Sequence, residues 1–412
     1  MGGKYLGLIK KGIHYLKNYD KITASAGIDT SDQLVHVESV FGFTTDRREV
    51  PFSQADYERN KTGKHIVHWV IPEPGIGSGG HLNIFRFVSA MQRKGLQNRI
   101  YVRRPVQFFS DRELSDFLHQ HYPILDGSVE IHYTAEGMPF CHAIVATGWD
   151  TAYFVNNFNN TVSKYYFVQD FEPYFYPVGS ENQFAENTYR MGFRGLTAGD
   201  WLKNKLEKEY GMKCSSFHFS YDKDLYYPIE KRDDKKRVFF YARPVTPRRA
   251  WELGLLALME LHKLVPDLEV IFAGWDISNY YIPFVHLNAG SVQLKELADL
   301  YAQCDISLVM SLTNLSLLPL EVMASGGVIA TQDTENNSWM ISEDNAIIID
   351  TDPVNIARTM ADYLQHPEKL KQIRKNGIAY ALNTDWDRET EKVYNAIEAG
   401  INEDMMGKEV LS

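Results

Sequence analysis

From about residue 65 to the C-terminus, short apolar runs alternate with amphipathic stretches whose apolar residues recur at helical spacing. Short runs rich in β-branched and aromatic residues predict strands, and the longer amphipathic stretches predict helices. In the first half the predicted strands are 65–71, 99–103, 129–133, 143–147, 165–169 and 195–198. The helices predicted between them are 82–93, 113–120, 184–191 and 201–210. Strands that alternate with helices in this way predict parallel sheets covered by helices.

A polar, charged segment at 221–236 interrupts this pattern and is typical of a linker between domains. Beyond it the predicted strands are 237–242, 269–273, 305–310, 328–331 and 346–349. The predicted helices are 249–264, 294–303, 319–325, 354–365, 368–382 and 388–399. The chain is therefore predicted to be an α/β protein with two Rossmann-like domains facing a cleft. We assign an N-terminal extension to 1–64, the domains to 65–225 and 226–385, and a C-terminal helix to 386–412.

Net charge and cysteine usage narrow the class of protein. The chain has 412 residues, a formal net charge of −10 and three cysteines. The acidic balance argues against nucleic acid as a main partner. The cysteines are far apart and lack metal-ligand spacing, which favours reduced thiols in a cytosolic protein without a metal site or a cofactor.

The first residues predict a basic amphipathic helix. Leu6, Ile9, Ile13 and Leu16 recur at helical spacing, with lysines around them. Such a helix either packs on the protein or a partner, or lies on an anionic membrane surface. No apolar run reaches the roughly 18 residues of a membrane span.

A glycine-rich loop follows the first predicted strand of the N-terminal domain. Gly75, Gly77 and Gly80 match the G-x-G-x-x-G pattern of dinucleotide-binding loops. Pro72 and Pro74 lengthen the turn, which weakens that interpretation. An NADP-linked oxidoreductase stays an alternative, beside a loop whose backbone approaches a sugar or a phosphate and a loop that only packs a helix on a strand.

The strand at 305–310 leads into a helix whose start is suited to an anion. Pro319 fits the first turn, and Gly326 and Gly327 fit the end. Glu321 then lies one turn inside a helix whose first N–H groups are free. A diphosphate fits that end, and the carboxylate can accept hydrogen bonds from ribose hydroxyls. A solvated glutamate on an amphipathic helix is the competing interpretation.

Two further groups of polar residues follow predicted strands. Arg243 comes just after the strand at 237–242, and Arg248 and Arg249 are expected to begin the next helix, where cations are slightly unfavourable unless an anion is bound. Gln169, Asp170 and Glu172 end the strand at 165–169 among aromatic rings. These three predict either a sugar site or a buried polar turn.

These residues together are similar to a known family. The glycine-rich loop, Arg243, Arg248 and Glu321 followed by Val-Met-Ala-Ser-Gly resemble the retaining glycosyltransferases of family 4, which have the GT-B fold. Segments 146–153, 167–177 and 241–248 resemble more narrowly the bacterial rhamnosyltransferases that assemble surface glycans such as S-layer glycans. The family motif E-x7-E has its second acid at Glu321, but its first falls on Thr313.

The resemblance implies a function and a donor site. It implies transfer of L-rhamnose from dTDP-β-L-rhamnose to a lipid-carried, rhamnose-containing glycan, in the cytoplasm or at the inner face of the cell membrane, with the C-terminal helix crossing back to the first domain. Base and ribose are expected near Gly274, Leu287 and Glu321. Backbone N–H groups of Ser316, Leu317 and Leu318 are expected at the diphosphate with Arg243, Arg248 and Arg249.

The acceptor is expected at the N-terminal domain. The residues implied there are Gly79, Gly80, Gln169, Asp170 and Glu172. Thr313 and Asn314 are expected beside the donor sugar, and Asp170 is expected to steady positive charge on it. Because Thr313 replaces an acid, a sugar-binding protein without catalytic activity is the third hypothesis.

Overall fold

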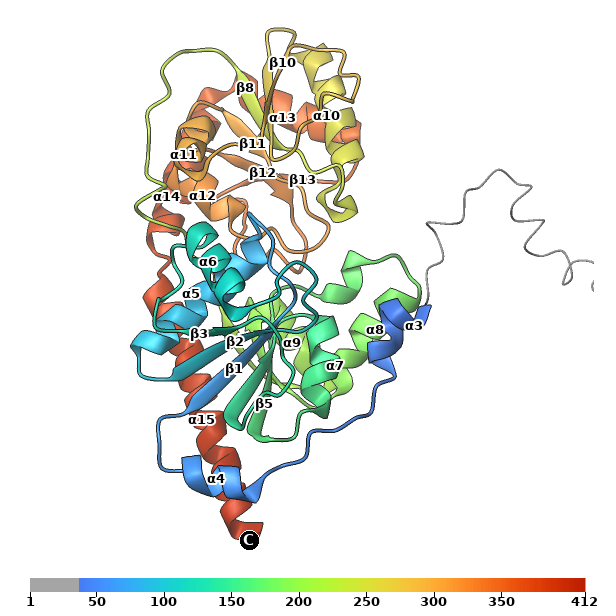
Figure 1. The fold of residues 1–412 in the computed structure, drawn as a ribbon. Coiled ribbons are helices and arrows are strands. Elements are labelled where there is room, and N and C mark those ends of the chain that lie inside the picture. The colour runs from blue at the N-terminus through green and yellow to red at the C-terminus, as the bar shows by residue number, and fades with distance from the viewer. Residues whose placement is uncertain (1–36, 412) are drawn as a thin grey trace, which may run out of the picture. The chain divides into compact units, whose positions relative to one another are not determined.

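The computed structural model describes residues 37–411, and the predicted basic helix near the N-terminus lies outside them. The chain divides into two compact units, and the first unit ends at Arg48. The described part of the first unit holds a short helix, α3 (Val37–Phe41), and a 3₁₀ turn, η1 (Gly42–Thr44). The second unit, from Glu49 onward, holds two parallel sheets that lie one above the other in Figure 1.

The first sheet has seven parallel strands in the order β3-β2-β1-β4-β5-β6-β7. Its strands are β1 (Ile66–Ile71), β2 (Gln97–Val102), β3 (Glu130–His132), β4 (Cys141–Ala146), β5 (Thr161–Val168), β6 (Arg194–Ala198) and β7 (Lys213–Phe217). Its helices are α4 (Gln54–Asn60), α5 (Gly79–Arg93), α6 (Asp111–His121), α7 (Trp149–Asn157), α8 (Ser180–Asn187) and α9 (Asp200–Tyr210), with 3₁₀ turns η2 (Glu172–Phe175) and η3 (Thr188–Arg190).

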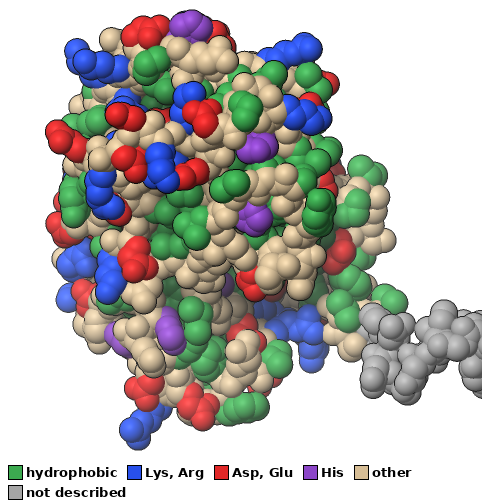
Figure 2. Space-filling view, turned by 90° about the horizontal axis from the view of Figure 1, so that it is seen from above, with side chains coloured by type: hydrophobic (Ala, Val, Ile, Leu, Met, Phe, Trp, Pro, Cys, Tyr) green, Lys and Arg blue, Asp and Glu red, His purple; other side chains and the backbone are tan. Residues whose placement is uncertain are grey.

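The second sheet has six parallel strands in the order β10-β9-β8-β11-β12-β13. They are β8 (Arg237–Tyr241), β9 (Glu269–Ala273), β10 (His286–Gly290), β11 (Ile306–Leu308), β12 (Ile329–Gln332) and β13 (Ile347–Ile349). The helices are α10 (Trp251–Leu264), α11 (Leu294–Ala302), α12 (Leu318–Ala324), α13 (Pro353–Gln365) and α14 (Pro367–Leu382), and a 3₁₀ turn η4 (Pro247–Arg249) precedes α10. Seen from above, this half carries acidic and basic side chains interspersed over its surface (Figure 2).

Alternating side chains place each sheet between two apolar layers. All six residues of β1 are buried, with Trp69 in the layer under α5 and α6 and Val70 in the layer under α7 and α9. In β8, Phe239 and Phe240 likewise face opposite sides. Because successive strand residues point to opposite faces, a sheet with helices on both sides needs such continuous apolar strands. The two α/β halves predicted from the sequence are confirmed.

One apolar cluster runs through both halves of the second unit. It joins the α5 and α6 side of the first sheet to the α11, α12 and α14 side of the second. The last helix, α15 (Trp386–Leu411), contacts α5, β5 and β7 of the first half (Figure 1). The hydroxyl of Tyr165 in β5 donates to the carbonyl of Ile397 at 3.0 Å. The last helix is thus held against the first sheet.

The helix expected at 249–264 begins later than its apolar pattern indicates. Pro247–Arg249 form the turn η4, Ala250 has a φ of 50°, and α10 begins at Trp251. Arg248 and Arg249 therefore do not occupy the first turn of α10, and that part of the sequence interpretation is wrong. The two arginines lie on the turn that connects β8 to α10.

Candidate functional site

The carboxyl ends of β5 and β11 carry loops that contact one another. Gln169 and Asp170 follow β5, and Asn314 lies in the loop after β11. The Asn314 amide Nδ2 donates to the Gln169 carbonyl at 2.7 Å, and the Asn314 backbone N–H donates to Asp170 Oδ2 at 3.3 Å. Ligands of α/β proteins bind at the carboxyl ends of strands. Gln169 and Asp170, which the sequence grouped at one strand end, thus lie together with Asn314, which it predicted separately.

The loop after β11 is fixed by its own hydrogen bonds. Ser311 Oγ donates to the Asn314 carbonyl at 3.0 Å, and the Ser316 N–H donates to Asn314 Oδ1 at 2.7 Å. Ser316 has a φ of 62°, which is unusual for a residue with a side chain. Thr313 is buried and its carbonyl accepts from Asn336 Nδ2. The loop therefore presents Thr313 and Asn314 to Asp170 in a defined geometry.

Three arginines belong to the segment that connects β8 to α10. The Arg249 guanidinium donates to the Asn314 carbonyl at 3.2 Å, and that of Arg248 lies 4.4 Å from the centre of the Phe175 ring. Arg243 lies 5.8 Å from the centre of the Trp275 ring. Burial lowers the pKa of both Arg248 and Arg249, and the Asp170 carboxylate opposes that shift. Two cations next to one carboxylate, with Arg243 near them, leave positive charge for an anion to neutralise.

Asp170 is the carboxylate of this cluster. Burial raises the pKa of Asp170, while the Thr313 hydroxyl, the Arg248 charge and backbone N–H groups oppose that rise. The Phe171 N–H donates to Asp170 Oδ1 at 2.8 Å. A carboxylate held by N–H groups beside a guanidinium can stabilise positive charge that develops near it.

Glu172 turns into the first half of the molecule. Its Oε2 accepts the Trp149 N–H at 2.7 Å, at the start of α7, and its Oε1 accepts the Tyr166 hydroxyl at 2.8 Å. Burial raises the pKa of Glu172 to about 8. Both oxygens are engaged inside the domain, so these contacts are those of a residue that positions α7 and the turn after β5.

The glycine-rich loop ends where α5 begins, and Gln169 ties it to β5. Gln169 Nε2 donates to the Gly80 carbonyl at 3.1 Å, and Asn83 Nδ2 donates to Gln169 Oε1 at 3.2 Å. A Cβ added to Gly79 would meet no protein atom within 4 Å. Packing within the protein therefore does not explain Gly79, whereas the close approach of a ligand would. The sequence interpretation did not include Asn83.

Gly274 is required by the backbone of the second half. It follows β9 with a φ of 110°, and an added Cβ would lie 2.6 Å from the Tyr241 ring. Its N–H donates to the Gly290 carbonyl at 2.7 Å, which joins the ends of β9 and β10. Leu287 of β10 is 55% exposed. Tyr241 and Gly274 thus lie together at strand ends of the second sheet.

Glu321 lies in the first turn of α12, where Leu317 is the N-cap residue and Leu318 the first helical residue. Burial raises the pKa of Glu321 to about 7, while the Tyr226 hydroxyl and the Arg86 charge oppose the rise. Arg86 belongs to α5 and lies 4.5 Å from the centre of the Trp386 ring. Neither Arg86 nor Tyr226 was predicted. For Arg86 the sequence did contain a signal, because an arginine four residues after Leu82 lies on the apolar side of the predicted helix.

The described residues contain neither a candidate metal site nor a candidate membrane span. No group of three or more histidine, cysteine, aspartate or glutamate side chains within residues 37–411 is placed to hold a metal ion. In the same part of the chain, no helix has both the length and the apolar composition that crossing a membrane requires.

Comparison with known proteins gives one family match and one curated relative. Residues 236–361 match the model of the WsaF C-terminal domain. The chain is 29% identical over 362 residues to the O-antigen biosynthesis protein RfbC of Myxococcus xanthus, an alignment that covers 86% of this chain and 28% of the relative. The chain thus spans between a quarter and a third of the length of RfbC.

The fold is similar to several solved structures. Sucrose-phosphate synthase from Thermosynechococcus elongatus gives a TM-score of 0.62 at 12% identity, covering 82% of this chain and 100% of the other. HepE from Anabaena, in complex with UDP and glucose, gives 0.61 at 12% identity, covering 81% and 100%. TarM from S. aureus gives 0.65 at 8% identity, covering 81% and 99%. The two Rossmann-like halves therefore form a GT-B fold, as the sequence predicted.

Proposed function

We propose that this protein is a retaining glycosyltransferase that moves L-rhamnose from dTDP-β-L-rhamnose to a glycan acceptor in bacterial surface-glycan synthesis. The observation that carries the proposal is the pair Arg248 and Arg249 beside Asp170, with Arg243 near the two arginines, at the contact between the two halves. The match to the WsaF C-terminal domain and the O-antigen relative support a role in glycan assembly. The rhamnosyl donor rests on the motif resemblance at 146–153, 167–177 and 241–248.

In this proposal the second half of the molecule binds the nucleotide. The diphosphate lies against Arg243, Arg248 and Arg249, because guanidinium groups match phosphate oxygens in geometry and charge. The backbone N–H groups of Leu317 and Leu318 add donors to it, whereas that of Ser316 already donates to Asn314 Oδ1. The ribose hydroxyls donate to Glu321, and the base lies near Gly274 and Leu287. A similar fold holds UDP in HepE.

The chemistry needs charge stabilisation at two places. The bond between the anomeric carbon and the phosphate oxygen breaks, the acceptor oxygen bonds to that carbon on the same face, and the acceptor proton passes to the departing phosphate. The arginines stabilise the negative charge on the phosphate. Asp170 stabilises the positive charge on the sugar ring, as expected of a preorganised group in a site poor in water.

In this proposal Thr313 and Asn314 lie beside the donor sugar. The family has an acid where this chain has Thr313, and here the negative charge next to that position is Asp170 of the other half. Asn314 holds Asp170 by its N–H group and Gln169 by its side chain. The acceptor enters from the first half, near Gly79 and Gly80, where there is room beside the backbone of Gly79.

Substitution of Arg248 tests this proposal. Arg248→Ala should slow rhamnose transfer from dTDP-rhamnose on the order of 10²-fold and weaken dTDP binding, since a preorganised charge at the leaving group is lost. The matched control is Arg112→Ala, whose side chain is 91% exposed on α6. It should transfer at the parental rate. Transfer by Arg248→Ala at the rate of the control, or no transfer from dTDP-rhamnose by the parent protein, would contradict the proposal.

A further inference from the structure

A half-buried guanidinium of the first half lies where three other parts of the chain meet. Arg86 belongs to α5, and its guanidinium lies 4.5 Å from the centre of the Trp386 ring, at the start of α15. Its electrostatic partners are Asp222, in the linker between the halves, and Glu321 of α12. Figure 1 shows α5 in the first half, below α12 of the second. Through Arg86 the first half therefore faces the carboxylate of the proposed ribose site.

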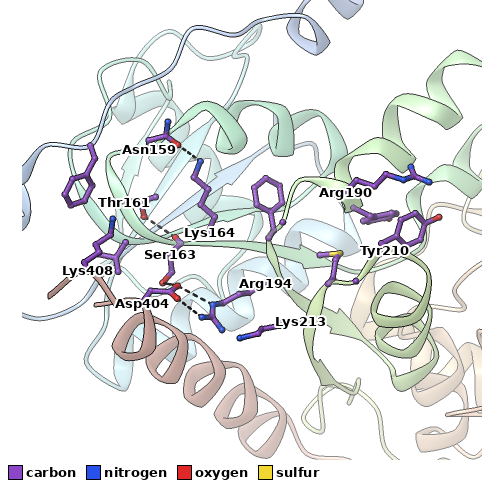
Figure 3. Close-up of a pocket in the computed structure, with 17 residues that line it drawn as sticks. Asn159, Thr161, Ser163, Lys164, Arg190, Arg194, Tyr210, Lys213, Asp404 and Lys408 are labelled. Carbon is purple, nitrogen blue, oxygen red and sulfur yellow. Dashed lines mark hydrogen bonds and ion pairs between the residues drawn. The ribbon is translucent and has the colours of Figure 1, made fainter. Parts of the chain in front are cut away.

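Arg86 has no direct ion pair among the described residues. Figure 3 shows the contrasting arrangement elsewhere in the first half, in which Arg194 pairs with Asp404 at 2.7 Å. The Nε of Arg86 is buried and has no hydrogen-bond partner. Burial lowers the pKa of Arg86, and Asp222 and Glu321 oppose that shift. Burying a charge costs free energy that an apolar side chain would avoid, so the charge at position 86 indicates a role beyond packing.

Glu321 needs a nearby cation if it is to act as a charged acceptor. Burial raises its pKa to about 7, the Arg86 charge lowers that pKa, and the Asp222 carboxylate raises it. The Tyr226 hydroxyl hydrogen-bonds to Glu321, and the buried Tyr301 of α11 also faces it. Of these four side chains Arg86 is the cation. A carboxylate has more acceptor capacity than a protonated carboxyl group and makes stronger hydrogen bonds.

We propose that Arg86 is a positioning residue for the nucleotide, which acts from the first half through the charge on Glu321. With Arg86 in place, Glu321 stays a carboxylate that accepts from the ribose hydroxyls. The guanidinium is held by α5 and by the Trp386 ring. Nucleotide affinity therefore depends on how the first half lies against the second. This inference rests on the proposed nucleotide site and extends it to a residue that does not touch the nucleotide.

Calorimetric measurement of dTDP affinity from pH 6 to pH 9 tests the inference. In the parent, affinity should rise with pH through about 7, as Glu321 loses its proton. Arg86→Met should move this rise to higher pH, so that dTDP binds about three- to tenfold more weakly at pH 7 and nearly as in the parent at pH 9. Arg86→Lys keeps a cation and should retain most of the affinity. The dTDP phosphates titrate equally for every variant, so the ratio of affinities to the parent is compared at each pH.

Three further variants separate a charge effect from a loss of structure. Asp222→Asn removes a carboxylate that disfavours charge on Glu321, so it should strengthen dTDP binding at pH 6.5, opposite to Arg86→Met. Glu321→Gln has no proton to lose, and Arg86→Met added to it should change dTDP affinity by less than about twofold. Arg93→Met is the matched control, because Arg93 is an exposed arginine of the same helix. It should bind dTDP like the parent at every pH.

The outcomes distinguish this inference from the proposed function. Parental affinity of Arg86→Met at every pH, or a loss that is equal at every pH and persists beside Glu321→Gln, overturns the positioning role and leaves the nucleotide site standing. If Glu321→Gln itself binds dTDP like the parent, the ribose assignment fails and the inference fails with it. If Arg86→Met does not fold, Asp222→Asn decides, and no gain in affinity at pH 6.5 overturns the role.

Discussion

Two glutamates that the sequence placed at the site, Glu172 and Glu321, have different surroundings. Glu172 accepts the Trp149 N–H and the Tyr166 hydroxyl, so its carboxyl group connects β5 to the start of α7. Burial raises the pKa of Glu321, and the Tyr226 hydroxyl of the linker and the Arg86 charge of α5 oppose that rise. Residue type and spacing identify both as acids near strand ends. Only the backbone path shows which one turns into the domain and which one lies beside the other half.

Glu172→Gln should flatten the dependence of stability on pH. The folded pKa of Glu172, about 8, lies above its ordinary value of 4.5. Between these two values the folded protein binds more protons at this group than the unfolded chain does. The free energy of unfolding therefore falls as pH rises from about 4.5 to 8, by on the order of 1 kcal/mol per pH unit at most. Glutamine removes this contribution and keeps a polar side chain of the same size at that place.

Thermal denaturation of the parent and the variant from pH 5 to pH 8 measures this difference. The control is Glu343→Gln, since Glu343 is an exposed residue. Identical pH slopes for Glu172→Gln and the parent would show that Glu172 is not buried as a proton-binding group.

At the scale of elements, the last helix shows how closely the two halves are joined. Gly400 of α15 lies directly against the Tyr165 hydroxyl of β5, and an added Cβ would also come within 3.1 Å of Arg194. Tyr165 in turn donates to the Ile397 carbonyl at 3.0 Å. The missing side chain at 400 is what lets α15 lie on the first sheet at this distance.

Gly400→Ala should therefore destabilise the protein. The overpacked contact costs about 1–3 kcal/mol, and the melting temperature should fall by several degrees. The matched control is Gly407→Ala in the same helix, where an added Cβ meets nothing within 4 Å. That variant should be neutral or gain up to about 1 kcal/mol from helix propensity. Equal melting temperatures for the two variants would contradict the close contact of α15 with β5.

Three elements that the sequence did not predict, β7, β10 and α7, have weak apolar patterns. β7 carries Lys213, Cys214, Ser215 and Ser216 and lies at the edge of its sheet, so it lacks the apolar run of a central strand. β10 is another edge strand, and Leu287 on it is exposed. α7 is nine residues long and follows Gly148, with a weak amphipathic pattern. The central strands were predicted because burial on both faces demands continuous apolar residues, whereas edge strands have no such demand.

At the scale of the whole molecule, the site exists only because two loops from different halves contact one another. Gln169 and Asp170 come from the end of β5, and Asn314 comes from the end of β11, 144 positions later than Asp170. The sequence could predict each group at a strand end, since βα alternation defines those ends. It could not predict their hydrogen bonds, because those depend on how the second half lies against the first.

In our account the two halves of the molecule have different roles in the reaction. The second half binds the nucleotide through Arg243, Arg248, Arg249 and Glu321, and the first half contributes Asp170 to the reacting sugar. A substitution at Asp170 should therefore affect chemistry and leave nucleotide affinity nearly unchanged. This separation distinguishes a catalytic carboxylate from a residue that only holds the halves together, which would alter both quantities.

The most direct test is the rate of rhamnose transfer by Asp170→Asn at saturating dTDP-rhamnose, with dTDP affinity measured on the same preparation. Asparagine keeps the size of the side chain and can still accept from one of the two N–H groups, that of Asn314 or that of Phe171, but it has no charge. We predict transfer on the order of 10²-fold slower than in the parent, with dTDP affinity within about twofold. Transfer at the parental rate, or a comparable loss of dTDP affinity, would contradict this assignment of the two halves.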